Sequence, residues 1–125
     1  MLGDKDAIAT IAVKDMKRAA LFYEGMLGFE RRHSMGSTAT AYRSGDASLF
    51  VYESEFAGTN KATAATWNVG GDLEAIVDDL QRKGVVFEHY RLPDTKVEGD
   101  IHISGHVRVA WFKDPDGNIL SIAAS

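Results

Sequence analysis

The chain has 125 residues, of which 45% are hydrophobic and 26% are charged, and its formal net charge is −4 at pH 7. A chain of this length and composition is expected to form one globular domain, or two half-domains that share a core. The acidic balance, without any run of basic residues, argues against nucleic acid as a partner.

The sequence also argues against a disulfide-bonded protein and against a membrane protein. The sequence has no cysteine, which excludes disulfides, thiolate catalysis and cysteine-bound zinc. Its start lacks a basic stretch followed by an apolar run, and its longest apolar stretches are far too short to span a bilayer. We therefore expect a cytoplasmic protein with no membrane partner.

The first half of the chain is predicted to form a strand, a helix and three further strands. Residues 7–13 are small and branched apolar residues typical of a strand. Asp15 is a plausible N-cap for a helix, which Gly28 would end in a left-handed conformation. Three further strands, separated by glycine and serine turns, are predicted over residues 29–34, 39–44 and 47–53.

The second half repeats this order. A strand is predicted over residues 64–69, followed by a helix that Asp72 caps and Gly84 ends. The apolar spacing that predicts this helix is that of Leu73, Ile76, Val77 and Leu80. Three strands are predicted over residues 85–90, 107–113 and 118–123. Residues 91–106 are expected to be an irregular loop, long enough to serve as a lid or binding loop.

The two halves are copies of one unit. Asp15 precedes Asp72 by 57 residues, and Gly28 precedes Gly84 by 56. A repeat of this length indicates two copies of one supersecondary structure. We place the first module at about residues 5–54 and the second at about 62–125, joined by a polar connector.

One further motif suggests a family. Asp114-Pro-Asp-Gly-Asn118 is typical of a tight turn between two strands. Together with the repeat, and with Phe22-Tyr23 before Leu27-Gly28-Phe29, it makes the chain resemble the vicinal oxygen chelate superfamily over about residues 7–123. That group includes glyoxalase I, bleomycin-resistance proteins and extradiol dioxygenases. The resemblance implies a single α+β domain of two tandem βαβββ modules, whose curved sheets form a cup, and a homodimer.

The resemblance also implies where a divalent metal would bind. Metal-dependent members take histidine and glutamate or glutamine ligands from the first and last strands of each module, because imidazole and carboxylate hold such an ion. The corresponding positions here are Ile8, Ala65 with Thr66 next to it, Ser121, and the neighbourhood of Phe50 with Glu53 a few residues further on. None is a histidine, and the aligned positions have no carboxylate. We therefore expect no metal and no other cofactor.

Aromatic side chains on the predicted strands are candidates for lining the cup around a flat or amphipathic ligand. Packing in the core or at a dimer interface is the other interpretation of these residues. The candidate ligand-binding residues are Trp67, Trp111, Tyr42, Tyr52, Phe50 and Lys61. Trp67 is the first choice and Trp111 the second. Lys61 would attract an acidic ligand at the rim, or would simply belong to the connector.

Two functions follow from these observations. The first is a metal-independent protein that binds a small organic molecule of unknown identity, as bleomycin-resistance proteins sequester a drug. The alternative is a metal-dependent lyase, isomerase or dioxygenase with a displaced site near His102 and His106, joined by Glu88 or Asp100. The spacing of the two histidines suits a helix, but Ile-Ser-Gly between them disfavours one, so exposed loop histidines are the simpler interpretation. The catalytic residues, if the protein is an enzyme, are unknown.

Overall fold

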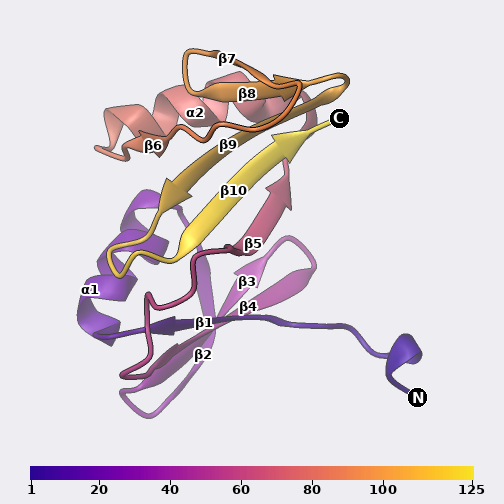
Figure 1. The fold of residues 1–125 in the computed structure, drawn as a ribbon. Coiled ribbons are helices and arrows are strands. Elements are labelled where there is room, and N and C mark those ends of the chain that lie inside the picture. The colour runs from indigo at the N-terminus through magenta and orange to yellow at the C-terminus, as the bar shows by residue number, and fades with distance from the viewer. The chain divides into compact units, whose positions relative to one another are not determined.

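The structure is a computed structural model that describes the backbone of residues 1–125 and every side chain except that of Leu2. The chain folds into two compact units, Met1–Asn60 and Lys61–Ser125, and each unit contains one sheet and its own helical segments (Figure 1). This confirms the predicted α+β class. No helix of the described residues is long and apolar enough to cross a membrane.

Unit 1 has four strands, and its sheet order is β1-β4-β3-β2. β1 is parallel to β4, whereas the other neighbours are antiparallel. All of the predicted strands form, within two residues of the predicted bounds. The elements are a 3-10 turn Leu2–Asp4, β1 Ala9–Val13, α1 Met16–Ala20, a π-helical segment Leu21–Met26, β2 Glu30–Met35, β3 Ala39–Ser44 and β4 Ala47–Glu53.

The predicted helix of unit 1 begins and ends where expected but changes type midway. The Asp15 carboxylate accepts a hydrogen bond of 2.8 Å from the backbone N–H of Lys17, and Gly28 adopts a φ of 79° after the last turn. From Leu21 onward the helix widens, and the N–H of Leu27 donates to the carbonyl of Phe22, five residues earlier. The wider turn leaves both Phe22 and its neighbour Tyr23 buried.

The two faces of the unit 1 sheet differ in chemistry. Strand pairing places Tyr42 beside Leu49 and Thr40 beside Val51, and all four are buried. The ring of Tyr42 stacks on that of Tyr23 with centroids 6.2 Å apart, so this face belongs to the core. The alternating residues point the other way because side chains of a strand alternate between faces. They include Ala39, Ala41, Phe50 and Tyr52.

Unit 2 has a six-stranded sheet of order β5-β10-β9-β8-β7, in which β6 also pairs with β9. β10 runs parallel to β5 and antiparallel to β9. The elements are β5 Thr63–Asn68, a 3-10 turn Gly70–Asp72, α2 Leu73–Arg82, β6 Phe87–Glu88, β7 Lys96–Glu98, β8 Ile101–Ser104, β9 Val107–Lys113 and β10 Ile119–Ala124.

Three predictions for unit 2 are wrong. The predicted strand 85–90 is only two residues long, and the predicted irregular loop 91–106 contains the hairpin β7–β8, which extends the sheet beyond β9. Gly99 makes the tight turn of this hairpin with a φ of 62°. Asp72 is also not a side-chain cap: it ends the 3-10 turn before α2 and makes no capping hydrogen bond.

The core of unit 2 lies on one face of its sheet. α2 lies against β10 and buries its apolar stripe of Leu73, Val77 and Leu80. The matching buried residues of the sheet are Ala110, Phe112, Leu120 and Ile122, which strand pairing places on one face. At the helix surface, Arg108 of β9 binds the carboxylate of Glu74.

The Asp114–Asn118 turn joins β9 to β10 as predicted. The carboxylate of Asp114 accepts hydrogen bonds from the backbone N–H groups of Asp116 (2.9 Å) and Asn118 (2.8 Å), and from the Asn118 side-chain amide (2.7 Å). Gly117 takes the left-handed conformation with a φ of 90°. The turn therefore fixes the register in which β10 returns beside β9.

Candidate functional site

The strand pairing of unit 2 decides which residues occupy the metal-ligand positions implied by the resemblance. β5 and β10 pair so that Thr66 lies beside Ser121, whereas Ala65 lies beside Leu120 on the core face. Thr66 and Ser121 therefore point to the same face, away from the core. Their hydroxyl oxygens are 2.7 Å apart and hydrogen-bonded, and Ser121 is only 3% exposed.

These residues do not fit a divalent metal. Two neutral hydroxyls that already bond each other are weak ligands beside imidazole or carboxylate. In unit 1, Ile8 is apolar, and the Glu53 carboxylate accepts a hydrogen bond of 3.0 Å from the backbone N–H of Met16. Among the described residues, no three acidic or histidine side chains gather closely enough to hold an ion.

Aromatic side chains adjoin the hydroxyl pair on the same face of unit 2. Trp111 of β9 pairs with Ser121, and its indole N–H donates to the Thr63 hydroxyl over 3.2 Å. His102 of β8 pairs with Val109, two residues before Trp111, so its ring projects to the same face. We define the polar-aromatic wall as Thr66, Tyr90, His102, Trp111 and Ser121.

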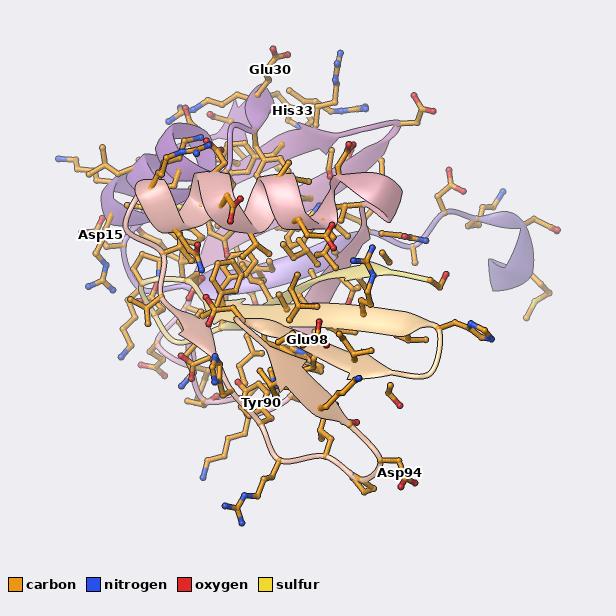
Figure 2. All side chains as sticks on the ribbon, turned by 90° about the horizontal axis from the view of Figure 1, so that it is seen from above. Asp15, Glu30, His33, Tyr90, Asp94 and Glu98 are labelled. Atoms are coloured by element: carbon orange, nitrogen blue, oxygen red, sulfur yellow. The ribbon has the colours of Figure 1, made fainter. Side chains whose placement is uncertain are left out.

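The rings of the wall pack edge to face. The Trp111 ring meets the His102 ring at 84° with centroids 4.8 Å apart, and the Tyr90 ring at 77° with centroids 5.4 Å apart. Tyr90 follows β6 and is labelled in Figure 2. Its backbone N–H donates to Nε2 of His102 over 2.9 Å, which ties the segment after β6 to β8.

Two polar atoms of the wall are buried and lack a hydrogen-bond partner among the described residues. They are Nδ1 of His102 and the phenol oxygen of Tyr90. Burial, and then the negative charge of Glu88, raises the pKa of Tyr90, while Lys113 lowers it by a smaller amount. The phenol is therefore a neutral hydroxyl near pH 7, and it is able to donate a hydrogen bond.

The structure does not assemble the displaced metal site. His102 is 2% exposed on β8, whereas His106 is exposed in the turn after that strand. Glu88 lies 3.5 Å from the Lys113 ammonium, and Asp100 bonds His89 over 2.7 Å. Interpreting both histidines as exposed loop residues is thus right for His106 and wrong for His102. The alternation in Ile101-His102-Ile103 was the available signal for a strand.

The predicted ligand-binding residues of unit 2 do not all share the wall. Trp111 lies in it. Trp67 pairs with Ile122, so its half-buried side chain projects to the core face of the sheet, opposite Trp111. Trp67 and Trp111, the first and second choices for a pocket, therefore lie on opposite faces of the unit 2 sheet. Lys61 is exposed in the segment before β5.

Of the predicted residues in unit 1, Tyr42 cannot reach a ligand because it is 0% exposed and belongs to the core. Phe50 and Tyr52 lie on the opposite face, where their rings stack with centroids 6.0 Å apart. Tyr52 is 36% exposed and Phe50 is half-buried, so both remain available for binding.

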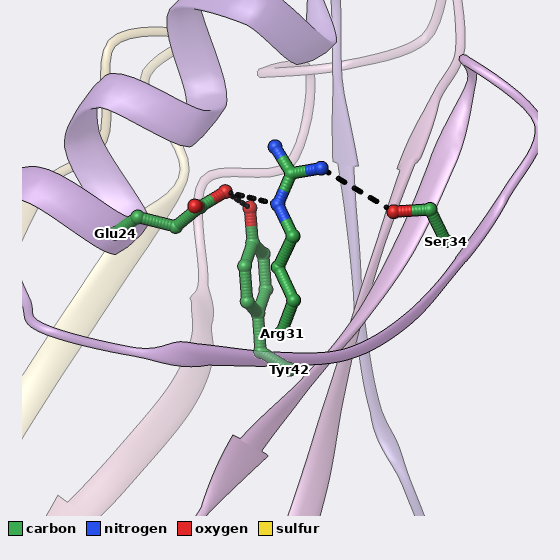
Figure 3. Close-up of polar contacts among 4 residues, drawn as sticks. All are labelled: Glu24, Arg31, Ser34 and Tyr42. Atoms are coloured by element: carbon green, nitrogen blue, oxygen red, sulfur yellow. Dashed lines mark hydrogen bonds and ion pairs between the residues drawn. The ribbon is translucent and has the colours of Figure 1, made fainter.

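Tyr42 instead anchors a polar cluster at the edge of the unit 1 core (Figure 3). One carboxylate oxygen of Glu24 accepts hydrogen bonds of 2.8 Å from the Tyr42 hydroxyl and from Nε of Arg31. Arg31 also donates to the Ser34 hydroxyl over 3.4 Å. Burial, and then the bond to Glu24, raises the pKa of Tyr42 well above its ordinary value, and Glu24 raises the pKa of Arg31.

This cluster predicts a loss of stability in alkali. Because the folded pKa of Tyr42 is raised, the unfolded chain loses its phenol proton first, and stability falls as the pH rises above about 10. Tyr42→Phe cannot ionise, so its stability should fall less steeply over the same range. Urea unfolding at several alkaline pH values measures both slopes. Parallel slopes for the two proteins would contradict the assignment.

A family model described as Glyoxalase/Bleomycin resistance protein/Dioxygenase superfamily matches residues 6–122. A search of curated proteins found no matching relative.

Several solved structures share the fold. An integron cassette protein from the mobile metagenome of the Halifax Harbour sewage outfall has a TM-score of 0.72 at 18% identity, with 94% of this chain and 96% of that chain covered. The fosfomycin resistance protein FosX from Mesorhizobium loti has a TM-score of 0.70 at 13% identity, with coverage of 100% and 94%.

A mutant of FosX from Listeria monocytogenes, complexed with Mn(II) and 1S,2S-dihydroxypropylphosphonic acid, has a TM-score of 0.73 at 16% identity, with coverage of 100% and 92%. At these identities the solved structures show a shared fold alone. The family model spans nearly the whole chain and confirms the resemblance in the sequence. This protein therefore belongs to the Glyoxalase/Bleomycin resistance protein/Dioxygenase superfamily.

Proposed function

We propose that this chain is a metal-independent member of its superfamily that binds a small organic molecule against the polar-aromatic wall of unit 2. The observation that carries the proposal is the Thr66–Ser121 hydroxyl pair. It stands at two positions where metal-dependent members would carry a histidine and a carboxylate. A hydroxyl pair can orient a ligand through hydrogen bonds, but it gives a divalent ion little to bind.

The wall has the composition of a small-molecule site. Such sites combine apolar and aromatic surface with a few placed polar groups. Trp111 is half-buried and offers a flat apolar surface, and the hydroxyls of Thr66 and Ser121 lie on the same face. Apolar area covered by a ligand would contribute about 25 cal/mol per Å² to binding, and the hydroxyls would select its orientation.

The similarity to FosX raises the competing possibility of metal-dependent chemistry, since the Listeria protein was solved with Mn(II). In this chain the described residues offer no group of three suitable ligands, and His102 is buried whereas His106 is exposed. A metal-dependent lyase, isomerase or dioxygenase remains the alternative function, and a divalent ion bound at about one per chain would favour it.

We also propose that residues 1–125 form one domain of two modules, about 5–54 and 62–125, and that the protein acts as a cytoplasmic homodimer. The supporting observation is that each sheet has open edges, β1 and β2 in one and β5 and β7 in the other. Unpaired strand edges are a liability that pairing with a second copy removes. Light scattering at micromolar concentration tests this, and a monomer would contradict it.

Removing the indole of Trp111 should weaken ligand binding. A thermal-shift screen of aromatic metabolites and antibiotics would first identify a ligand, and Trp111→Ala should then bind it at least about tenfold more weakly because an aromatic contact surface is lost. The matched control is Trp67→Ala, which removes the same side chain from the opposite face of the sheet.

Each variant is compared with its own ligand-free melting temperature, so a general loss of stability does not affect the result. Retained binding by Trp67→Ala together with lost binding by Trp111→Ala supports the wall. The reverse pattern would place the ligand on the other face of the sheet and contradict the proposal.

A further inference from the structure

We infer that His102 and Tyr90 form a pair of buried hydrogen-bond donors that receives an acceptor oxygen of an uncharged ligand. The inference rests on the proposed binding function and specifies the class of ligand. Its starting point is that Nδ1 of His102 and the Tyr90 hydroxyl are both buried and have no hydrogen-bond partner among the described residues. A buried polar group without a partner is costly and therefore rare in native proteins.

The hydrogen bond from Tyr90 fixes the role of the His102 ring. Nε2 accepts the backbone N–H of Tyr90 over 2.9 Å, so this nitrogen must carry a free lone pair. In a neutral imidazole the proton then resides on Nδ1. Nδ1 is thus a donor, and we assign this tautomer from the geometry of the bond. A partner for Nδ1 must supply an acceptor atom.

Both donors belong to the wall that we assign to the ligand. His102 and Trp111 project to the same face of the sheet, and the Trp111 ring contacts both the His102 and Tyr90 rings. The two donors come from different segments, β8 and the residues after β6, and the Tyr90 N–H bond holds those segments together. A ligand lying against Trp111 would therefore adjoin the two rings that carry the donors.

The charges around the pair select a neutral ligand. Glu88 pairs in the sheet with Trp111, and its negative charge acts on the Tyr90 phenol. Asp100 bonds His89, whose ring meets that of His102 at a centroid distance of 5.9 Å. Carboxylates on this side disfavour an anion, although Lys113 partly offsets Glu88. A cation cannot accept from either donor, so a carbonyl oxygen of an amide, ketone or quinone suits the site best.

The first test measures whether the unpaired Tyr90 hydroxyl lowers the melting temperature of the ligand-free protein. Tyr90→Phe removes only that hydroxyl, and the ligand-free variant should melt about 2–4 °C higher because an unpaired buried polar atom is gone. The matched control is Tyr42→Phe, whose hydroxyl bonds Glu24 and whose loss should lower the melting temperature. A lower melting temperature for both variants would overturn the inference.

The second test uses three one-ring probes that differ in one group: acetophenone with a neutral carbonyl, ethylbenzene without an acceptor, and benzoate with a negative charge. Binding is followed through the Trp111 indole N–H resonance. Acetophenone should bind more tightly than the other two. Tyr90→Phe and His102→Gln should each weaken acetophenone binding about three- to tenfold and leave ethylbenzene binding unchanged. In His102→Gln, the new amide oxygen can still accept the Tyr90 N–H.

The outcomes separate this inference from the proposed function. If all probes shift the Trp111 resonance equally, and neither substitution alters acetophenone affinity, His102 and Tyr90 do not donate to the ligand. The wall would then remain a binding surface. If benzoate binds best, the ligand class is wrong. If no probe shifts the resonance at its solubility limit, the wall is not a small-molecule site, and both the inference and the proposed function fail.

Discussion

Asp114→Ala will destabilise the protein by about 3 kcal/mol or more, as measured by urea unfolding. The buried carboxylate accepts hydrogen bonds from two backbone N–H groups and one side-chain amide in the turn between β9 and β10. Each bond to a charged acceptor contributes about 1.5–3 kcal/mol, and the donors left behind are partly buried. Against a total stability of about 5–15 kcal/mol, this is a large loss.

The control for this prediction is Asp114→Asn. The new side-chain amide keeps one acceptor oxygen for the two backbone N–H groups. It lacks the second oxygen that accepts the hydrogen bond from the Asn118 side-chain amide. The free energy of unfolding of Asp114→Asn should lie between those of the wild type and of Asp114→Ala. Because the turn sets β10 beside β9 and thereby places Ser121 beside Trp111, ligand binding should weaken in the same order. Equal stability of all three proteins would contradict the role given to Asp114.

The second large effect is a gain of metal binding. Thr66→His combined with Ser121→Glu should bind zinc at least about tenfold more tightly than the natural chain, because imidazole and carboxylate would then replace the two hydroxyls on adjacent strands. Isothermal titration with zinc and with manganese measures the change. The double variant will be less stable, since the Ser121 position is almost fully buried.

The control is Ala65→His combined with Ser121→Glu. It carries the same two new side chains, but Ala65 lies beside Leu120, so the imidazole would project to the core face of the sheet. This variant should gain no metal binding. If it binds zinc as tightly as the Thr66 variant, or if neither variant binds more tightly than the natural chain, the strand positions assigned to the ligands are wrong.

The sequence was sufficient for elements whose signals are local. Asp15 and Gly28 mark the start and the end of the first helix, because an N-cap and a left-handed residue after the last turn each depend on a single side chain. The Asp114–Asn118 turn was predicted for the same reason. The hairpin β7–β8 was not predicted, because its strands are three and four residues long and carry charged and histidine side chains within that length.

The site was harder to predict because it depends on which strands pair and in what register. Alternation divides a strand into two faces without saying which face packs on a helix. The register of β5 against β10 shifts near Leu120, so counting along the sequence could not choose between Ala65 and Thr66. The same ambiguity left open that Trp67 and Trp111 lie on opposite faces of the sheet. The burial of His102 and Tyr42 depends on contacts between distant segments that no local pattern records.

The most direct test of this account is the metal content of the natural chain, purified without a histidine tag or chelator and dialysed against zinc, nickel or manganese. If the protein is metal-independent, the ratio of metal to chain should be near zero for every ion after removal of the free metal. A ratio of about one divalent ion per chain would contradict metal independence. That result would show that the protein holds a metal despite the Thr66–Ser121 hydroxyl pair, and the metal-dependent reactions of the superfamily would become the leading functional hypothesis.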